Sequence, residues 1–279
     1  MFKRLFLLIL IMVAMGCSLK SQDFSFMTYN IRLDIASDGE NAWPERKDFV
    51  VSQIQFLAPD IFGIQEGMPH QTEYLKTTLE SYDYIGHGRD GNNNGEYSAI
   101  FFNTDKFTVT QQHTFWLSET PDALSKGWDA AYPRICTYGL FTSKETGEQF
   151  WVFNTHLDHK GEEARKEGLA LVRNKIKEIN TDGLPAVLMG DFNTEPQHEI
   201  IAKMEEAMLD SKKTAKFSYG QEGTFNGFIT DEIPLRRIDY IFVLKESGYK
   251  VKKYATLSSL VNLKYPSDHF PVYISITKE

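Results

Sequence analysis

The chain has 279 residues, of which 42% are hydrophobic and 13% aromatic, and its formal net charge is −8. This length and composition allow one large buried core and do not require two domains. The acidic balance, with a single dense basic run at 212–216, argues against a protein that grips a long nucleic acid, because such proteins carry a basic stripe that displaces counterions.

The N-terminus has the pattern of a targeting segment. A positively charged start precedes an apolar run over 5–14, and small residues stand before Cys17. The run is too short to span a bilayer. We expect a signal peptide over 1–16, a lipidated Cys17 and a tether over 17–23, with an ordinary secretory cleavage site as the alternative. The protein is then exported, as a periplasmic or outer-membrane lipoprotein of a bacterium, and meets the membrane only through its N-terminal lipid.

The rest of the chain, 24–279, alternates predicted strands and helices as one α/β domain. We expect strands over 24–31, 60–65, 97–102, 107–115, 135–142, 149–155, 185–190, 238–244, 249–256 and 271–276, and helices over 44–57, 71–79, 162–179 and 199–208. The long, turn-rich segments 86–95 and 118–133 are expected to be functional loops. Cys136 is the one cysteine after Cys17, so it is predicted to be a buried small side chain rather than part of a disulfide.

The strand over 185–190 ends in Gly190 and is followed by Asp191 and Asn193. Side chains two residues apart in an extended segment lie on the same side, so a carboxylate and an amide point together from this strand end. They could hold a water molecule and an oxyanion, or simply cap the following turn.

Further polar residues stand at the ends of other predicted strands or inside them. Each has an ordinary structural explanation, such as capping a loop or accepting buried hydrogen bonds. Asp239 is the exception, because a carboxylate inside an apolar strand is costly unless it is paired. Their recurrence suggests one catalytic site at the edge of a sheet; they are Asn30, Glu66, Glu96, His156, Asp239, Asp268 and His269.

Six short motifs carry a family resemblance. They are Thr-Tyr-Asn at 28–30, Gln-Glu at 65–66, Asn-Thr-His-Leu at 154–157, Gly-Asp-Phe-Asn at 190–193, Ile-Asp-Tyr-Ile at 238–241 and Ser-Asp-His-Phe-Pro-Val at 267–272. In this order they resemble the endonuclease/exonuclease/phosphatase superfamily, whose archetype is deoxyribonuclease I, over 24–276. The resemblance implies a four-layer αββα sandwich, in which two packed, mostly antiparallel sheets are flanked by helices.

The resemblance also implies a divalent metal and its ligands. Glu66 would be the main ligand, with Asn30 assisting and Asp268 adding a carboxylate beside the metal. Oxygen ligands without a cysteine cluster suit Mg²⁺, or Mn²⁺ or Ca²⁺, rather than structural zinc.

The remaining motif residues would perform the hydrolysis. By resemblance, Asp191 orients and deprotonates the attacking water, and Asn193 holds the phosphoryl group. His156 would pair with Glu96, and His269 with Asp239. A carboxylate that is hydrogen-bonded to one nitrogen of an imidazole fixes the tautomer of the ring and stabilises the imidazolium cation.

The fold hosts nucleases, phospholipases and phosphatases alike, so the substrate is predicted from loop residues. Arg32, Arg89 and Arg134 could bind phosphate oxygens. Trp128 could stack on a sugar or headgroup, or pack within its loop, and His159 could contact substrate or lie on the surface. We therefore expect a monomeric phosphoester hydrolase for a small phosphorylated compound, such as a sugar phosphate, an inositol phosphate or a lipid headgroup. An extracellular nuclease and a non-catalytic surface-binding lipoprotein are the alternatives.

Overall fold

The structure is a computed structural model that describes residues 22–278. The predicted signal peptide over 1–16 and Cys17 lie outside the described residues, as does the predicted tether apart from 22–23. Asp23 already belongs to the first strand, so this strand begins one residue earlier than predicted. Among the described residues, none of the helices combines the length and hydrophobicity of a membrane span.

Strands dominate the chain, with helices between some of them. The strands are β1 (Asp23–Asn30), β2 (Ile61–Gln65), β3 (Tyr82–Ile85), β4 (Ile100–Asn103), β5 (Phe107–Trp116), β6 (Ile135–Ser143), β7 (Gln149–His156), β8 (Ala186–Asp191), β9 (Met208–Asp210), β10 (Phe217–Gly220), β11 (Asp239–Leu244), β12 (Tyr249–Thr256) and β13 (Val272–Lys278). The helices are the 3-10 helix η1 (Ala36–Asn41) and the α-helices α1 (Trp43–Leu57), α2 (Pro69–Thr78), α3 (Glu162–Ile179), α4 (Glu199–Glu205) and α5 (Ser211–Thr214).

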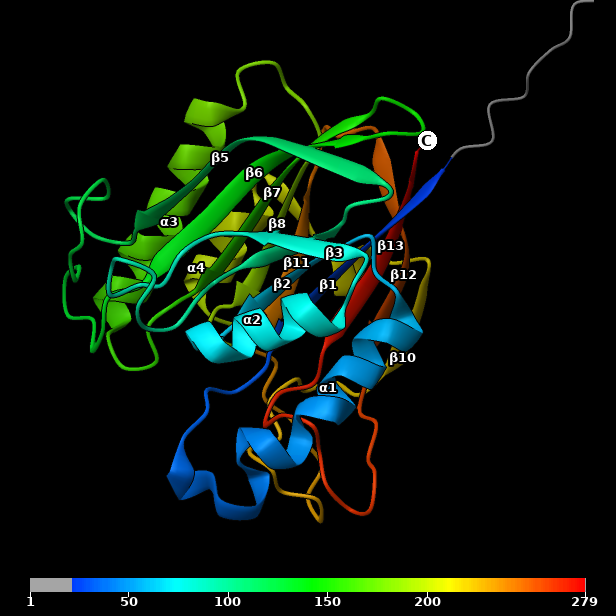
Figure 1. Cartoon of the computed structure of the whole chain (residues 1–279). Helices are drawn as coiled ribbons and strands as arrows, with labels where there is room; N and C mark the ends of the chain where they lie inside the picture. The colour runs from blue at the N-terminus through cyan, green and yellow to red at the C-terminus, as the bar shows by residue number, and fades with distance from the viewer. Residues whose placement is uncertain (1–21, 279) are drawn as a thin grey trace, which may run out of the picture.

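These strands form two sheets that pack face to face. The seven-stranded sheet has the order β10-β12-β13-β1-β2-β4-β3, and the six-stranded sheet has the order β5-β6-β7-β8-β11-β9. The pairs β1/β2, β7/β8 and β10/β12 are parallel, and the other neighbours are antiparallel. Helices α1 and α2 cover the outer face of the first sheet, and α3 and α4 cover the second (Figure 1). The predicted four-layer sandwich of mostly antiparallel sheets is therefore confirmed.

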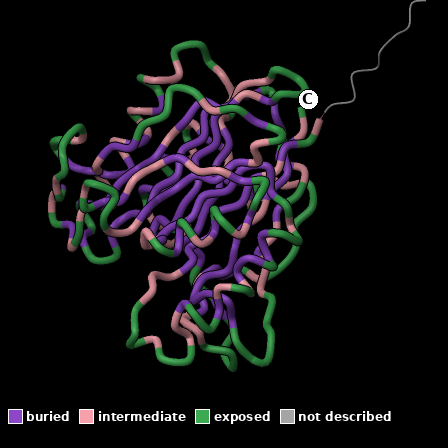
Figure 2. Tube along the Cα trace, in the orientation of Figure 1, coloured by how far each residue is buried: buried purple, intermediate pink, exposed green. Residues whose placement is uncertain are grey.

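Three apolar clusters hold the four layers together, and the strands are the most deeply buried part of the chain (Figure 2). One lies between the sheets and includes Phe26, Phe150 and Ile274. The others lie under α3 and α4 and under α1 and α2. Helix α3 joins its cluster through apolar side chains that recur every three or four residues, as an amphipathic helix requires. Cys136 is fully buried in this cluster, as predicted.

A polar bridge crosses the otherwise apolar space between the sheets. The Asn154 amide nitrogen on β7 donates to the backbone oxygens of Ile64 and Ala99 at 2.8 and 2.9 Å, and its oxygen accepts from Gln65 at 2.7 Å. Gly63 makes room for this side chain, because a Cβ there would lie 2.6 Å from the Asn154 amide carbon. Buried polar groups that are hydrogen-bonded favour one arrangement of a core, so this bridge helps to set how the two sheets align.

Element boundaries differ from the sequence prediction in a few places. Strands β3, β9 and β10 were not predicted, since each spans only three or four residues and gives little periodicity. The helix predicted over 199–208 ends at Glu205, because Met208 pairs with Leu244 as a strand. The strand predicted over 97–102 begins at Ile100, while Tyr97 instead forms bridges to Gly67 and Gly88.

Candidate active site

The centre of the site is the end of β8. Asp191 stands opposite His156 of β7 on one side and opposite Asp239 of β11 on the other. Gly190 allows this close strand packing, since its φ is +149° and a Cβ would lie 1.9 Å from the Thr155 backbone oxygen. Sheet register alone therefore places three of the predicted residues in one row.

Polar groups converge on the Asp191 carboxylate, which is 1% exposed. The backbone N–H of Asn193 donates to Oδ1 at 2.8 Å, and Nδ2 of Asn30 donates to Oδ2 at 3.0 Å. Oδ2 also lies 3.5 Å from Nε2 of His156 and 3.7 Å from Nε2 of His269. One carboxylate oxygen thus faces an amide and two imidazoles that come from both sheets and from the loop before β13.

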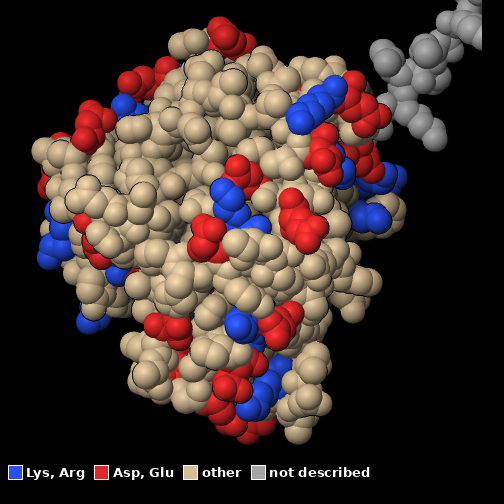
Figure 3. Space-filling view, viewed as in Figure 1, with Lys and Arg blue, Asp and Glu red and all other residues tan. Residues whose placement is uncertain are grey.

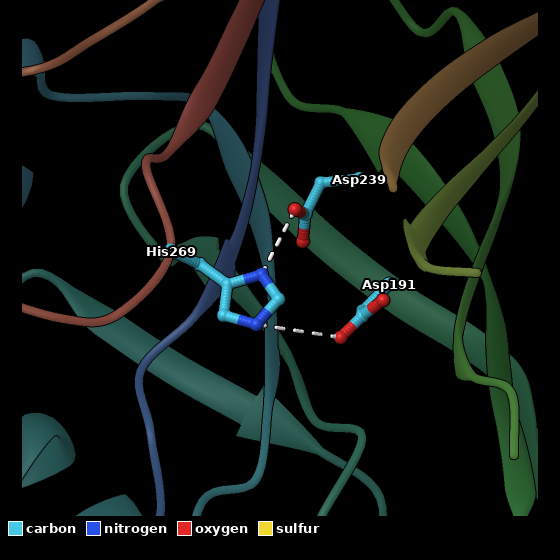
Figure 4. A group of neighbouring side chains, drawn as sticks. All are labelled: Asp191, Asp239 and His269. Atoms are coloured by element: carbon cyan, nitrogen blue, oxygen red, sulfur yellow. Dashed lines mark hydrogen bonds and ion pairs between the residues drawn. The ribbon is translucent and has the colours of Figure 1, made fainter. Parts of the chain in front are cut away.

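His269 lies between two carboxylates (Figure 4). Its Nδ1 is 2.9 Å from Asp239, which confirms that predicted pair, and its Nε2 faces Asp191. Burial alone would lower the pKa of His269, but the charges of Asp239 and Asp191 outweigh it and raise the pKa to about 10. The His269 imidazole is therefore a buried cation at neutral pH.

The pKa values of Asp191 and His156, the other two groups at the centre, shift in opposite directions. Burial, together with the charge of Asp239, raises the pKa of Asp191 to about 7. Burial and the nearby Arg134 and Arg89 guanidinium groups lower the pKa of His156 well below its ordinary value. A carboxylate that titrates near neutral pH is suited to accept a proton from water, so the predicted role of Asp191 as a general base is chemically consistent with its surroundings.

The predicted metal ligands lie beside Asp191. Glu66 accepts from Asn30 at 3.1 Å and from the backbone N–H of Leu33 at 3.0 Å. The Arg32 guanidinium lies 3.8 Å from Glu66 and 3.8 Å from Asp268, so a cation already stands between these two carboxylates. The carboxylate oxygens of Glu66 and Asp268 around this cationic position fit a divalent metal such as Mg²⁺, whereas the Asn30 amide turns its nitrogen to Glu66 and its oxygen to the Arg32 N–H. The Asp191, Asp239 and His269 group also has ligand atoms within 4.8 Å of one another.

A cavity of about 580 Å³ opens above these residues. Arg32, Arg89, Arg134 and His159 line it together with Glu66, Glu96, His156, Asp191, Asn193, Asp268 and His269. Arg32 is held by two hydrogen bonds to Asp38, at 2.9 and 3.0 Å. The three arginines predicted to bind substrate therefore surround one space.

One sequence expectation is corrected, and the cavity gives no support to a second. Glu96 does not pair with His156: it forms an ion pair with Arg89 at 2.7 Å, whereas Nε2 of His156 accepts from the Asn193 amide at 3.1 Å. Arg89 is only seven residues away in the same loop and brings a full charge to the buried carboxylate. Trp128 is not among the cavity-lining residues; its backbone N–H bonds weakly to Glu119 at 3.4 Å.

The sequence did not single out several residues that build the site. Tyr132, Phe225 and Arg236 line the cavity. Buried Arg46 donates to the backbone oxygens of Ile31, Arg32, Asn41 and Pro266, and so ties the loop after β1 to the loop that carries Asp268. An arginine at the start of a predicted helix gives no signal of such contacts; only the buried position of Arg46 reveals them.

Comparisons with known proteins agree with this geometry. A solved structure from Bacteroides thetaiotaomicron, described as an endonuclease/exonuclease/phosphatase family protein, is 39% identical to this chain. Its TM-score is 0.88, over 93% of this chain and 99% of that chain. A mannosyl-6-phosphatase from the same species is 41% identical, with a TM-score of 0.85 over 91% and 99%. The human Nocturnin catalytic domain is 21% identical, with a TM-score of 0.72 over 92% and 95%, and shares the fold. An uncharacterized protein of Acanthamoeba polyphaga mimivirus is 28% identical over 83% of this chain and 91% of its own length.

The sequence profile of one family spans most of the domain. Residues 27–269 match the profile described as the Endonuclease/Exonuclease/phosphatase family. The match includes the strand ends that carry Asn30, Glu66, Asp191 and His269. The chain belongs to the endonuclease/exonuclease/phosphatase family and is a phosphoester hydrolase.

Proposed function

We propose that this protein is a divalent-metal-dependent phosphatase that removes phosphate from a small sugar phosphate, of the kind represented by mannose 6-phosphate. The observation that carries the proposal is the cavity above Asp191. It is about 580 Å³ in volume, which is within the usual range for small-molecule sites. It unites the acid–base residues Asp191 and His156 with three arginines in one open cavity.

Charge supports a small substrate over a long polyanion. The net charge is −8, and on the face shown in Figure 3 basic and acidic residues are interspersed, without a continuous basic stripe. The arginines near the site are themselves paired with Asp38, Glu96 and Asp158. They can supply hydrogen bonds to one phosphate group, but they do not make a track for a nucleic-acid backbone.

The relative with a named substrate supports the same class. The mannosyl-6-phosphatase is 41% identical to this chain, and the alignment covers 99% of that protein. Nocturnin, at 21% identity, supports the fold and leaves the substrate open. A hexose phosphate is therefore the first substrate to test.

The residues act by positioning and by charge. Asp191 accepts a proton from the attacking water, and Asn193 holds the phosphoryl group at the same edge. Neutral His156 positions Asn193, because its Nε2 accepts a hydrogen bond from the Asn193 amide. The His269 cation, fixed by Asp239, stabilises negative charge that develops on the phosphoryl group. Glu66, Asn30 and Asp268 would hold the metal, which supplies neutralisation of phosphate oxygens when bound.

The test is a comparison of substrates. Phosphate release from mannose 6-phosphate and cleavage of single-stranded and duplex DNA are measured with added Mg²⁺ or Mn²⁺, at low and moderate salt. We expect kcat/KM for the sugar phosphate to be higher by orders of magnitude. Asp191→Ala should remove the activity, and Asp182→Ala, a matched change at an exposed site, should not. If DNA is the better substrate and its cleavage falls steeply with salt, the protein is a nuclease.

A further inference from the structure

One wall of the cavity is built around two aromatic rings that the hydrolysis does not use. Tyr132 and His159 both line the cavity. Their rings are nearly parallel, with an interplanar angle of 18° and centroids 6.0 Å apart, which is the offset stacking typical of aromatic pairs. Tyr132 is 51% exposed, so this pair leaves aromatic surface uncovered beside the catalytic residues.

Buried charges hold the two rings in place. The Asp158 carboxylate accepts from the backbone N–H groups of Ala131 at 3.1 Å, Lys160 at 2.9 Å and Gly161 at 2.8 Å, and from Arg134 at 3.2 Å. It therefore ties the loop before β6 to the loop after β7. The Arg89 guanidinium carbon lies 4.9 Å from the Tyr132 ring centroid, and this cation–π contact also helps to hold the tyrosine.

The hydrogen bonds also fix which nitrogen of His159 can donate. Nη2 of Arg134 lies 3.0 Å from Nδ1 of His159. Because a guanidinium group can only donate, Nδ1 must accept, and in the neutral ring the proton is then on Nε2. Burial and the charge of Arg134 lower the pKa of His159, which agrees with the neutral form. The ring thus offers one N–H donor beside the exposed tyrosine.

We propose that Tyr132 and His159 form the binding site for the sugar part of the substrate. The Tyr132 ring packs against the C–H face of a pyranose ring, and Nε2–H of His159 donates to a sugar hydroxyl. This inference rests on the proposed phosphatase function and deepens it. The aromatic surface suits the apolar face of the ring, and the neutral donor suits a hydroxyl, which needs no charged partner.

The experiment compares two phosphate esters, one that contains a sugar and one that does not. Mannose 6-phosphate and propyl phosphate are both esters of primary alcohols, but propyl phosphate has neither ring nor hydroxyl groups. In Tyr132→Ala and His159→Leu we expect kcat/KM for mannose 6-phosphate to fall by about tenfold, as expected for the loss of one stacking contact or one hydrogen bond. For propyl phosphate, kcat/KM should be nearly unchanged. Most of the loss should be in KM, because the sugar contacts hold both ground state and transition state.

Conservative variants separate binding from folding. Tyr132→Phe keeps the ring, and His159→Gln places an amide N–H near the position of Nε2, so both should retain most of the preference for mannose 6-phosphate. Tyr219→Ala, at a tyrosine that is 75% exposed on β10, is the matched control and should change kcat/KM for neither substrate. Thermal unfolding of each variant verifies that the domain is folded.

Each outcome decides between the two proposals. If the wild-type protein prefers the sugar phosphate and the Ala and Leu variants lose that preference, the sugar site is supported. If the preference survives both substitutions, or if both substrates are affected equally, the sugar site is wrong while the phosphatase function stands. If the wild-type protein shows no preference for mannose 6-phosphate, the proposed substrate class and the sugar site are both wrong.

Discussion

The two sides of the cavity are built in different ways. On one side Asp191, Asp239 and His156 stand at facing positions of three adjacent strands, and strand pairing sets their spacing. On the other side Arg89, Tyr132 and His159 come from loops that are held by hydrogen bonds to a few buried side chains. In our proposal, the sheet side carries the groups that react, and the loop side carries the groups that select the substrate. Substitutions on the two sides should therefore fail in different ways.

The largest effect is expected on the sheet side, from Asp239→Asn. This change removes the carboxylate that orients and charges His269, so turnover should fall by roughly two to four orders of magnitude. The pKa of His269 should also fall from about 10, since burial would then dominate. Phosphate-release kinetics measure the first effect, and NMR titration of the imidazole in metal-free protein measures the second. Wild-type turnover in this variant would show that His269 needs no partner.

The same pair predicts a pH dependence of stability. A histidine whose pKa is raised in the folded state stabilises fully below its unfolded pKa of about 6.5 and loses this contribution as pH rises towards about 10. The free energy of unfolding of the metal-free wild-type protein should decrease over that window, and Asp239→Asn should flatten the decrease. Urea unfolding at several pH values measures it. If the free energy of unfolding depends equally on pH in both proteins, the His269–Asp239 pair is not the source of that dependence.

A smaller effect, on thermal stability, is expected from Glu66→Gln, which directly follows β2 of the seven-stranded sheet. Added Mg²⁺ should raise the melting temperature of the wild-type protein, because a ligand that binds only the folded state stabilises it. Glu66→Gln should reduce that rise, and excess chelator should abolish both the rise and the activity. Glu80→Gln, at an exposed glutamate, serves as the matched control. Full activity in chelator would rule out a metal-dependent reaction.

On the loop side, Asp158→Asn should affect stability as well as activity. Burial would raise the pKa of Asp158, but the backbone N–H groups of Gly161, Lys160 and Ala131 and the charge of Arg134 outweigh it and lower the pKa. Its stabilisation is therefore present above its ordinary pKa of about 3.9 and is lost as pH falls. We expect the free energy of unfolding of Asp158→Asn to be lower by about 1–3 kcal/mol at pH 7. We also expect this free energy to decrease less on acidification than it does in the wild-type protein. Denaturant unfolding at pH 7 and at several pH values below about 3.9 tests both, and an unchanged acid dependence would contradict the assignment.

The smallest effect is expected from Trp128→Ala. Trp128 shares the loop over 118–133 with Tyr132 but is not a cavity-lining residue, so kcat/KM for the sugar phosphate should stay within about twofold of wild type, as for a substitution away from the site. A tenfold loss would mean that the cavity extends further along this loop than its lining residues indicate.

The same difference explains what the sequence could predict. Asp191, His156, Asp239 and His269 were found because short motifs place them at strand ends, and pairing brings strand ends together. The Glu96 partner was wrong, because the competing Arg89 lies in an irregular loop where no periodicity indicates which side chains meet. Tyr132 and His159 are 27 positions apart in sequence; the antiparallel pairing of β6 with β7 brings their loops together, and the hydrogen bonds of the buried Asp158 hold the two loops in place.

Asn30 has a consequence for folding. It ends β1 in the seven-stranded sheet, and its amide donates to Asp191 of the six-stranded sheet. Strand β1 is itself flanked by β13, formed by residues 272–278. During synthesis, therefore, the sheet that contains β1 is complete only after nearly the whole domain has left the ribosome. Activity should be the last native property to return during refolding, after secondary structure, because the site exists only when early and late segments of the chain have met.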